Sequence, residues 1–249
     1  MESNVKPRFI AGVVMPHEIA ELSTRAEPLL PPDVQRLCSS INISDYTPDG
    51  VNEAIGKHYW RCVDELVKQG AGSICLAGFP IASQLGRERV LALQEETRAK
   101  TGVTADSHAE ATVAALKRFG ATRIGVASRW ADALNTKLVA YLKHAGIEVQ
   151  AVTTADQWAG KAFSMSLDEG VRLSFQLGKE ARKRAPEAQA ILLAGGAWRS
   201  LAAVPVLEED FGVPVVTNPI AEIWRIIDAG HAPPVQGWGR LLANNIPRK

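Results

Sequence analysis

The stretch Gln189–Leu201, QAILLAGGAWRSL, decides the fold of this 249-residue chain. Its apolar run Ala190–Ala194 enters a Gly-Gly pair, and the residues from about Trp198 to 211 predict a helix. A buried parallel strand that ends in a tight glycine turn presents backbone N–H groups at its carboxyl end, where α/β proteins bind their ligands. We therefore expect a strand, an anion-binding turn and a helix in this order.

A second copy of this pattern lies earlier in the chain, in SICLAGFPIAS. The segments Ile74–Gly78 and Ile191–Gly195 share the pattern I-x-L-A-G. This repeat predicts two related halves that face a common cleft. Because an alanine-rich chain also produces such short matches by coincidence, the repeat alone does not decide the point.

Apolar runs alternate with amphipathic stretches along the whole chain, which predicts an α/β fold with parallel strands and covering helices. Several runs are almost continuous in Val, Ile, Leu and Ala, as a sheet covered on both faces requires. One helix is expected over about 83–100, and Ser107 or Asp106 is expected to cap another whose first turn holds Glu110. We divide the chain into one lobe of 1–103 plus 218–249 and a second lobe of 104–217.

The composition excludes several classes of protein. Hydrophobic residues make up 46% of the chain, and the net charge of +1 gives no electrostatic case for nucleic acid or an anionic membrane. No signal peptide or membrane-spanning run is present, so we expect a soluble, cytoplasmic protein. The three cysteines have no C-x-x-C spacing and predict reduced thiols. The composition leaves a homo-oligomer open.

Further stretches carry a family resemblance through their order and spacing. They are Gly12–Pro16, Thr47–Gly50, Leu66–Ala71, Ala115–Arg123, Gly212–Val216 and Gly237–Leu241. With them, the chain resembles the arylmalonate decarboxylase and maleate cis-trans isomerase family of the aspartate/glutamate/hydantoin racemase superfamily. The resemblance covers nearly the whole chain. It implies two pseudo-symmetric Rossmann-like lobes with parallel sheets and an active site in the cleft between them.

The resemblance also implies two positions for cysteine, one at a strand end of each lobe, of which isomerases and racemases use both and the decarboxylase only the second, and here this chain departs from the family. The matching positions are Gly78 and Gly195, neither of which can act as a nucleophile or proton donor. The positions that supply hydroxyl and amide groups for a substrate carboxylate read Phe79, Pro80 and Trp130. Proline has no N–H, and the other two side chains have no hydroxyl. The backbone of Gly195 and Gly196 is what remains of the anion site.

Two histidines flanked by carboxylates are the candidates for acid–base chemistry. His17 and Glu18 follow the first expected strand, and His108 closes a strand of the second lobe with Asp106 and Glu110 within two residues. We predict His17, His108, Glu18 and Glu110 as catalytic residues. A divalent metal such as zinc on His17, His108 and Asp106 is a weaker alternative, because no short metal motif is present. Both histidines are also compatible with ordinary surface positions.

Other residues near the glycine turns are candidates for holding a small-molecule substrate. Arg199 could hold a carboxylate, or could be a surface arginine on the first turn of a helix. Phe79, Trp130 and Trp198 would make an aromatic pocket wall, or belong to the core. The predicted substrate-binding set is Gly78, Phe79, Pro80, Trp130, Gly195, Gly196, Trp198, Arg199 and Asn218.

Three functions remain open. The first is an enzyme without catalytic cysteine that hydrolyses a small carboxylate-bearing substrate of hydantoin-like or thiocarbonyl type. Its acid–base groups would be histidine and carboxylate side chains, with or without a metal. The alternative is a cofactor-free decarboxylase or isomerase that acts at the α-carbon of a small carboxylate with histidine as proton donor. The third is a binding protein that has kept the cleft and lost the chemistry.

Overall fold

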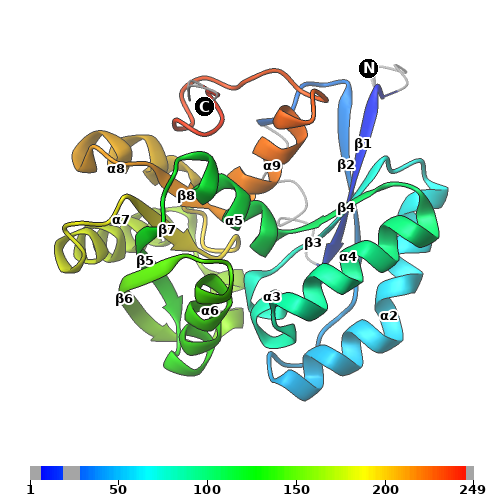
Figure 1. Cartoon of the computed structure of the whole chain (residues 1–249), viewed down its shortest axis with the longest axis horizontal. Helices are drawn as coiled ribbons and strands as arrows, with labels where there is room; N and C mark the ends of the chain where they lie inside the picture. The colour runs from blue at the N-terminus through cyan, green and yellow to red at the C-terminus, as the bar shows by residue number, and fades with distance from the viewer. Residues whose placement is uncertain (1–6, 19–28, 245–249) are drawn as a thin grey trace.

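The computed structural model describes residues 7–18 and 29–244 and contains two parallel four-stranded sheets (Figure 1). The strands are β1 Phe9–Met15, β2 Val34–Ser40, β3 Ser73–Leu76 and β4 Thr104–Ser107 in the first sheet, and β5 Arg123–Trp130, β6 Glu148–Gln157, β7 Ala190–Ala194 and β8 Val215–Thr217 in the second. The helices are α2 Pro48–Lys68, α3 Phe79–Leu85, α4 Arg87–Thr101, α5 His108–Arg118, α6 Asp132–His144, α7 Leu167–Arg184, α8 Val204–Phe211 and α9 Asn218–Asp228, with 3-10 turns η2 Ala159–Ser164 and η3 Leu201–Ala203.

The two sheets have the same topology. Their strand orders are β2-β1-β3-β4 and β6-β5-β7-β8, so each places its own second strand at one edge and its fourth at the other. The repeated I-x-L-A-G segments form β3 and β7, the third strand of each sheet, and both are followed by a glycine turn. The predicted α/β fold of two pseudo-symmetric lobes with parallel sheets is thereby confirmed.

The fourth strand of each sheet leads directly into a helix, and these two helices pack together between the lobes. β4 leads into α5 and β8 leads into α9 (Figure 1). The largest hydrophobic core runs through both lobes. Within it, the ring of Phe79 from α3 packs edge-on against Tyr141 from α6, with ring centroids 5.5 Å apart. One core is therefore common to both lobes, and a second, separate core lies within the first lobe beside α2.

One strand lies in a different sheet from the one that the sequence predicts. We expected residues 104–107 in the second lobe, but β4 pairs with β3 in the first sheet, from Ser73 opposite Thr104 to Leu76 opposite Ser107. A strand of four residues has too little periodicity to indicate its sheet, and Gly102, at φ = +74°, turns the chain back beside β3. His108 therefore follows the first sheet, and both predicted histidines start from the same lobe.

The stretch Gln189–Leu201 also differs from the prediction, in the residues after its two glycines. No helix begins near Trp198; instead Arg199 has a left-handed backbone at φ = +56°, and the chain passes through η3 before α8 begins at Val204. A residue in that conformation cannot continue a right-handed helix. The Gly-Gly turn consequently has no helix N-terminus directly behind it.

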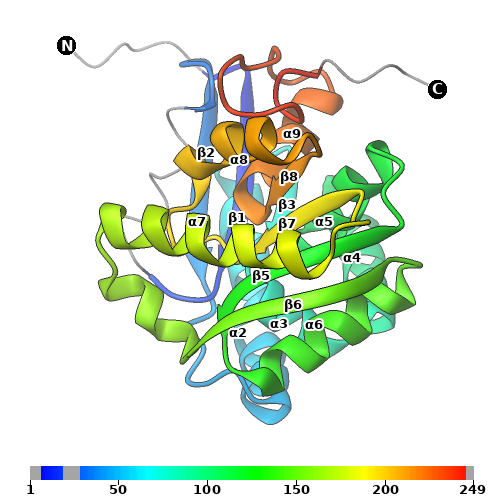
Figure 2. The same cartoon turned by 90° about the vertical axis from the view of Figure 1, so that its left-hand side faces the viewer.

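The covering helices follow the predicted α/β plan with one interruption. The single helix expected over 83–100 is two helices, α3 and α4, because Gly86 at φ = +79° separates them. On the other side of the molecule, α7 lies across β5, β6 and β7 (Figure 2). In the described part of the chain, no helix is long and apolar enough to cross a membrane.

Candidate active site

A cavity of about 80 Å³ lies between the lobes, where the glycine turns after β3 and β7 face each other. Its described lining comprises Met15, Pro16, Arg36, Tyr46, Ala77, Gly78, Phe79, Pro80, His108, Arg129, Trp130, Gly195, Gly196, Ala197, Pro219 and Glu222. We call this cavity the cleft. It brings together seven of the predicted residues, which are Gly78, Phe79, Pro80, His108, Trp130, Gly195 and Gly196.

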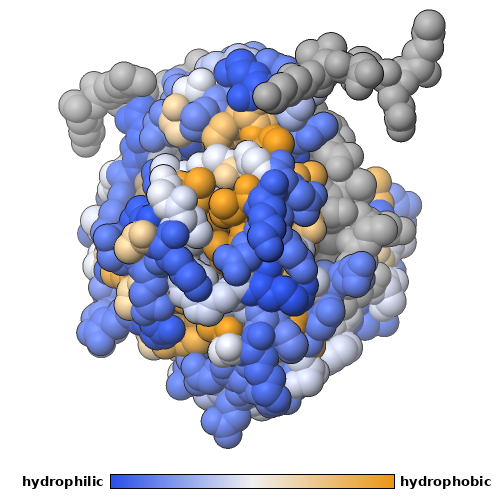
Figure 3. All heavy atoms as spheres, turned by 90° about the vertical axis from the view of Figure 1, so that its right-hand side faces the viewer, coloured by the Kyte–Doolittle hydropathy of each residue, from blue (hydrophilic) through white to orange (hydrophobic). Residues whose placement is uncertain are grey.

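A larger hollow of about 280 Å³ lies against the first sheet and α9. Figure 3 views this side of the molecule and shows an apolar hollow framed by hydrophilic side chains. Asp106, Cys75 and Arg225 are among its lining residues. Because ligands of parallel α/β sheets bind at the carboxyl ends of strands, the smaller cleft is the better candidate for an active site.

The remaining predicted substrate-binding residues lie outside the lining of the cleft. Trp198 is fully buried in the core, and its indole Nε1 has no hydrogen-bond acceptor among the described residues. Arg199 leaves the strand end on a left-handed backbone instead of a helical first turn. Asn218 is also fully buried. Its side-chain amide accepts a hydrogen bond from the backbone N–H of Gly195 and donates one to the hydroxyl of Thr112.

His108 does not have the open nitrogen that a general base needs. Its Nδ1 accepts the backbone N–H of Gly78 at 3.2 Å, and its Nε2 lies 2.5 Å from Oε2 of Glu222. An Nδ1 that accepts a hydrogen bond carries no proton, so the proton is on Nε2 and is donated to Glu222. Both nitrogens are engaged, and the expected role of His108 as a free base does not fit this geometry.

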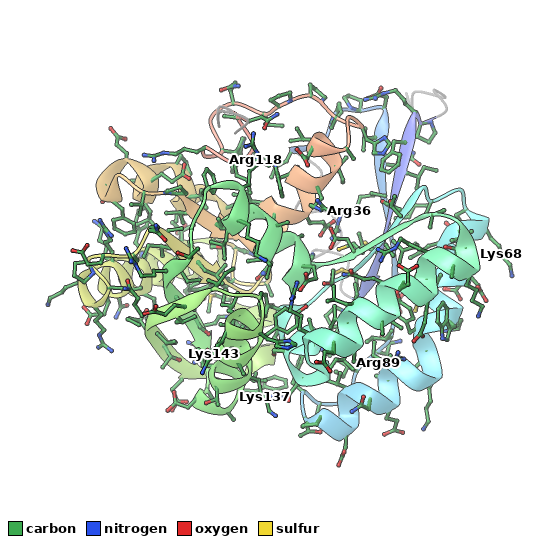
Figure 4. The ribbon with its side chains drawn as sticks, viewed as in Figure 1. Arg36, Lys68, Arg89, Arg118, Lys137 and Lys143 are labelled. Atoms are coloured by element: carbon green, nitrogen blue, oxygen red, sulfur yellow. The ribbon has the colours of Figure 1, made fainter. Side chains whose placement is uncertain are left out.

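Glu222 is the buried anion that organises this side of the cleft. The guanidinium of Arg36 on β2 holds its carboxylate through two bonds, Nε to Oε1 at 2.8 Å and Nη2 to Oε2 at 3.2 Å. Figure 4 shows Arg36 between α9 and the strands of the first sheet. Burial alone would raise the pKa of Glu222, but Arg36 and His108 lower it well below its usual range. The residue is therefore a permanent carboxylate.

The predicted metal ligands do not come together. Asp106 forms an ion pair of 2.6 Å with Arg225 and lines the larger hollow. Among the described residues, the ligand atoms of Cys75, His108 and Glu222 lie within 4.8 Å of one another. These three do not fit a divalent cation either, because Nε2 of His108 carries its proton toward Glu222 and Arg36 already supplies the positive charge.

Glu110 is committed to contacts on the far side of α5 and is no neighbour of the His108 ring. Its carboxylate accepts bonds from Arg87, at 2.8 and 3.0 Å, and from the hydroxyl of Tyr141 at 2.8 Å. Sequence proximity placed Glu110 beside His108, but α5 turns the two side chains in different directions. The carboxylate partner of His108 is Glu222 instead, 114 residues away.

His17 reaches the cleft through a tyrosine that the sequence did not single out. Its Nε2 lies 3.1 Å from the hydroxyl of Tyr46, which lines the cleft. Burial lowers the pKa of His17 and raises the pKa of Tyr46 well above its usual value, while the charge of Arg129 acts to lower the pKa of Tyr46. Glu18 is exposed and lines a separate polar cavity with His17.

Arg129 places a buried cation in the wall of the cleft. It is only 2% exposed, at the end of β5, and its Nη1 donates to the carbonyl of Trp158 at 3.3 Å. Burial lowers its pKa to about 10, so it is still charged at neutral pH. The available sequence signal was a charged residue close to the end of a predicted buried strand, and it was not among the residues predicted for the site.

The backbone of the glycine turn offers less to an anion than we expected. The N–H of Gly195 donates to Oδ1 of Asn218 at 2.6 Å, so that amide is already occupied. Gly196 also lines the cleft. An anionic ligand here would meet Arg129, the hydroxyl of Tyr46 and the turn after Gly195.

Known proteins resemble the chain over nearly its whole length. A family model described as arylmalonate decarboxylase matches residues 11–242. The arylmalonate decarboxylase of Bordetella bronchiseptica is 29% identical over 221 residues, which cover 85% of this chain and 87% of that protein. A crystal structure of arylmalonate decarboxylase has a TM-score of 0.75 at 26% identity and covers 94% of this chain and 98% of its own.

A maleate cis-trans isomerase of Nocardia farcinica shares the fold, with a TM-score of 0.80 at 22% identity over 95% of this chain and 99% of its own. That structure contains a covalently bound succinylcysteine intermediate, so its reaction passes through a thiol. In this chain both strand ends that face the cleft carry glycine. The likeness to this isomerase is one of fold.

Proposed function

The chain belongs to the arylmalonate decarboxylase family, and from this premise we propose that it acts on a small organic acid at the carbon beside a carboxylate, as a decarboxylase or isomerase. The family consists of enzymes of this kind, which favours this reaction over the hydrolysis that the sequence had led us to prefer. The occupied amide of Gly195 also weakens the oxyanion site on which a hydrolytic step would depend.

Arg129 is the observation that carries the proposal. The charged side chains that line the described cleft are Arg36, Glu222 and Arg129. Arg36 and Glu222 form an ion pair with each other, and Arg129 is a further cation in the wall of the cleft. A buried cation attracts an anion of matching charge strongly because little water screens the interaction. One carboxylate of the substrate would bind Arg129, and a second would lie against the rings of Phe79 and Trp130.

Tyr46 and His17 supply the proton in this proposal. Loss of carbon dioxide from a malonate breaks a carbon–carbon bond and leaves the electron pair on the α-carbon, as an enediolate stabilised by Arg129. The O–H bond of Tyr46 then breaks and a C–H bond forms. His17, in the tautomer with its proton on Nε2, returns that proton to the phenolate across the 3.1 Å hydrogen bond while its Nδ1 takes up a proton from solvent, so the ring stays neutral. A phenol with a raised pKa is still a far stronger acid than the C–H bond formed, so the transfer is favourable.

Turnover in deuterium oxide tests the reaction class. The protein would be incubated with 2-aryl and 2-alkyl malonates and with maleate, and carbon dioxide release and deuterium at the α-carbon would be followed by NMR. We expect deuterium at that carbon. Ring opening of a hydantoin without deuterium at carbon would support hydrolysis instead, and tight binding without any turnover would support a binding protein.

Variants of Arg129 test the assigned cation. Arg129→Met is expected to lower kcat/KM by about 100-fold or more, as removal of one oxyanion donor does in other enzymes. Arg129→Lys keeps the charge without the fork of donors and should recover part of the loss. Wild-type activity in Arg129→Met would show that another group holds the carboxylate.

A further inference from the structure

Helices α5 and α9 carry the same polar arrangement twice, once in each half of the molecule. The first residue of α5, His108, accepts the N–H of Gly78 after β3, and the first residue of α9, Asn218, accepts the N–H of Gly195 after β7. In each half, the third strand and the helix after the fourth strand are thereby joined. Both glycines line the cleft.

The side chains of His108 and Asn218, which we call the anchoring side chains, are each held by a residue of the other helix. Nε2 of His108 bonds to Glu222 at 2.5 Å, and Nδ2 of Asn218 donates to Oγ1 of Thr112 at 2.8 Å. Thr112 lies four residues after His108, and Glu222 lies four residues after Asn218. The first residue of each helix therefore bonds to the fifth residue of the other, and we call these four side chains the crossed network.

The crossed network is almost completely buried. His108 and Glu222 are 6% and 5% exposed, and Thr112 and Asn218 are fully buried. The hydroxyl proton of Thr112 goes to the carbonyl of His108 at 2.7 Å, which leaves an oxygen lone pair directed at Asn218. A buried amide or imidazole that loses its partner must reorient or stay unsatisfied, so each anchoring side chain depends on the residue opposite.

We propose that Glu222 and Thr112 are positioning residues of the cleft, each of which fixes from the opposite half the side chain that holds a strand-end amide. Glu222 selects the tautomer in which Nδ1 of His108 accepts from Gly78. Thr112 selects the orientation in which the amide oxygen of Asn218 faces Gly195. Both strand-end amides are thereby turned toward the helices and away from a ligand. This inference deepens the proposed function and rests on it only for its effect on turnover.

Hydrogen exchange at the two glycine amides, measured by NMR on the 15N-labelled protein, tests the proposal without a substrate. Thr112→Val should speed exchange at Gly195 by about tenfold, the equivalent of one hydrogen bond, and leave Gly78 unchanged. Thr112→Ser keeps the hydroxyl and should leave both amides as in the wild type. An equal increase in the exchange rates of both amides in Thr112→Val would indicate general loosening of the structure and overturn the proposal.

The reciprocal variant acts on the other half. Glu222→Met alone would leave Arg36 buried without its carboxylate, so Arg36→Met and Glu222→Met are combined to preserve folding. In this double variant Gly78 should exchange about tenfold faster while Gly195 keeps its protection. Unchanged protection of Gly78 would overturn the role of Glu222.

Two substitutions of His108 give a second test of how the amide of Gly78 is held. Asparagine at position 108 would reproduce the anchor of the second half, so His108→Asn should keep Gly78 protected and His108→Leu should not. Equal exchange at Gly78 in these two variants would also overturn the proposal. Because exchange needs no substrate, failure of the turnover experiments above would leave these outcomes unaffected.

Discussion

Gly195 follows β7 at a point where the backbone and a neighbouring ring both disfavour a side chain. Its backbone has φ = +108°, and a Cβ built there would lie 3.0 Å from Cζ2 of Trp130. L-residues rarely adopt that φ, and the indole leaves no room for a side chain. Glycine after β7 and tryptophan at the end of the neighbouring strand β5 are therefore linked choices.

Replacement of Gly195 by alanine should destabilise the protein by about 2–3 kcal/mol, from the strained backbone together with the contact with Trp130. Gly212→Ala is the matched control, because Gly212 also has a positive φ, +69°, but its Cβ would meet nothing within 4 Å. That control should lose about 1 kcal/mol. Urea unfolding of the two variants gives the comparison, and equal losses would show that Trp130 yields to the new side chain.

His17 should make stability depend on pH. Burial lowers its pKa from 6.5, so the unfolded chain takes up the proton before the folded protein does as the pH falls. The free energy of unfolding should therefore decrease between pH 7 and pH 5, and His17→Asn should reduce this decrease. His144→Asn, at an exposed helix end, serves as the control in urea unfolding at both pH values. A steeper decrease in His17→Asn would contradict the assignment.

At the scale of elements, short polar caps begin the two helices that meet between the lobes. Ser107, one of the two caps that the sequence left open, accepts the N–H of Glu110 at the start of α5, and Thr217 accepts the N–H of Ile220 at the start of α9. These caps fix where each helix begins, and so they fix where His108 and Asn218 lie. Local sequence is informative here because a cap acts over only three residues.

Removal of either cap should weaken the fold by a similar amount. Ser107→Ala and Thr217→Ala should each cost about 1 kcal/mol in the free energy of unfolding, measured in urea. Thr217→Ser retains the hydroxyl and should cost much less. If both alanine variants match the wild type, the helix starts are set by packing and the caps contribute little.

At the scale of the whole molecule, the sequence predicts the frame better than the site. The repeat around Gly78 and Gly195, the alternation of strands and helices and the resemblance to the family together predicted two parallel sheets facing a cleft. The sequence could not show which sheet β4 joins, because a strand of four residues has too little periodicity to indicate its sheet. Arg36 and Glu222 meet across 186 residues, and no local spacing reports such a contact. Nor does proximity in sequence reveal that Glu110 faces Arg87 while His108 faces Glu222.

The Arg36–Glu222 pair joins β2 to α9 and should contribute to stability as a unit. Both side chains are about 95% buried, at 4% and 5% exposure. Arg36→Met alone should cost about 3–5 kcal/mol, because Glu222 then remains as a buried charge without its main partner. The double change Arg36→Met with Glu222→Met should cost less than the sum of the two single changes in urea unfolding. Strict additivity would mean that the pair is not coupled.

The two glycine strand ends also bear on oxidative damage. A thiolate is inactivated by peroxide and by alkylating reagents in proportion to its exposure and its acidity. Here Cys62 and Cys75 are buried with raised pKa values, and Cys38 lies outside the described lining of the cleft. Turnover measured after treatment with iodoacetamide or hydrogen peroxide should therefore stay close to that of the untreated protein. Rapid inactivation would reveal a thiol in the reaction, whereas resistance would show that turnover survives oxidising conditions because it depends on no accessible thiol.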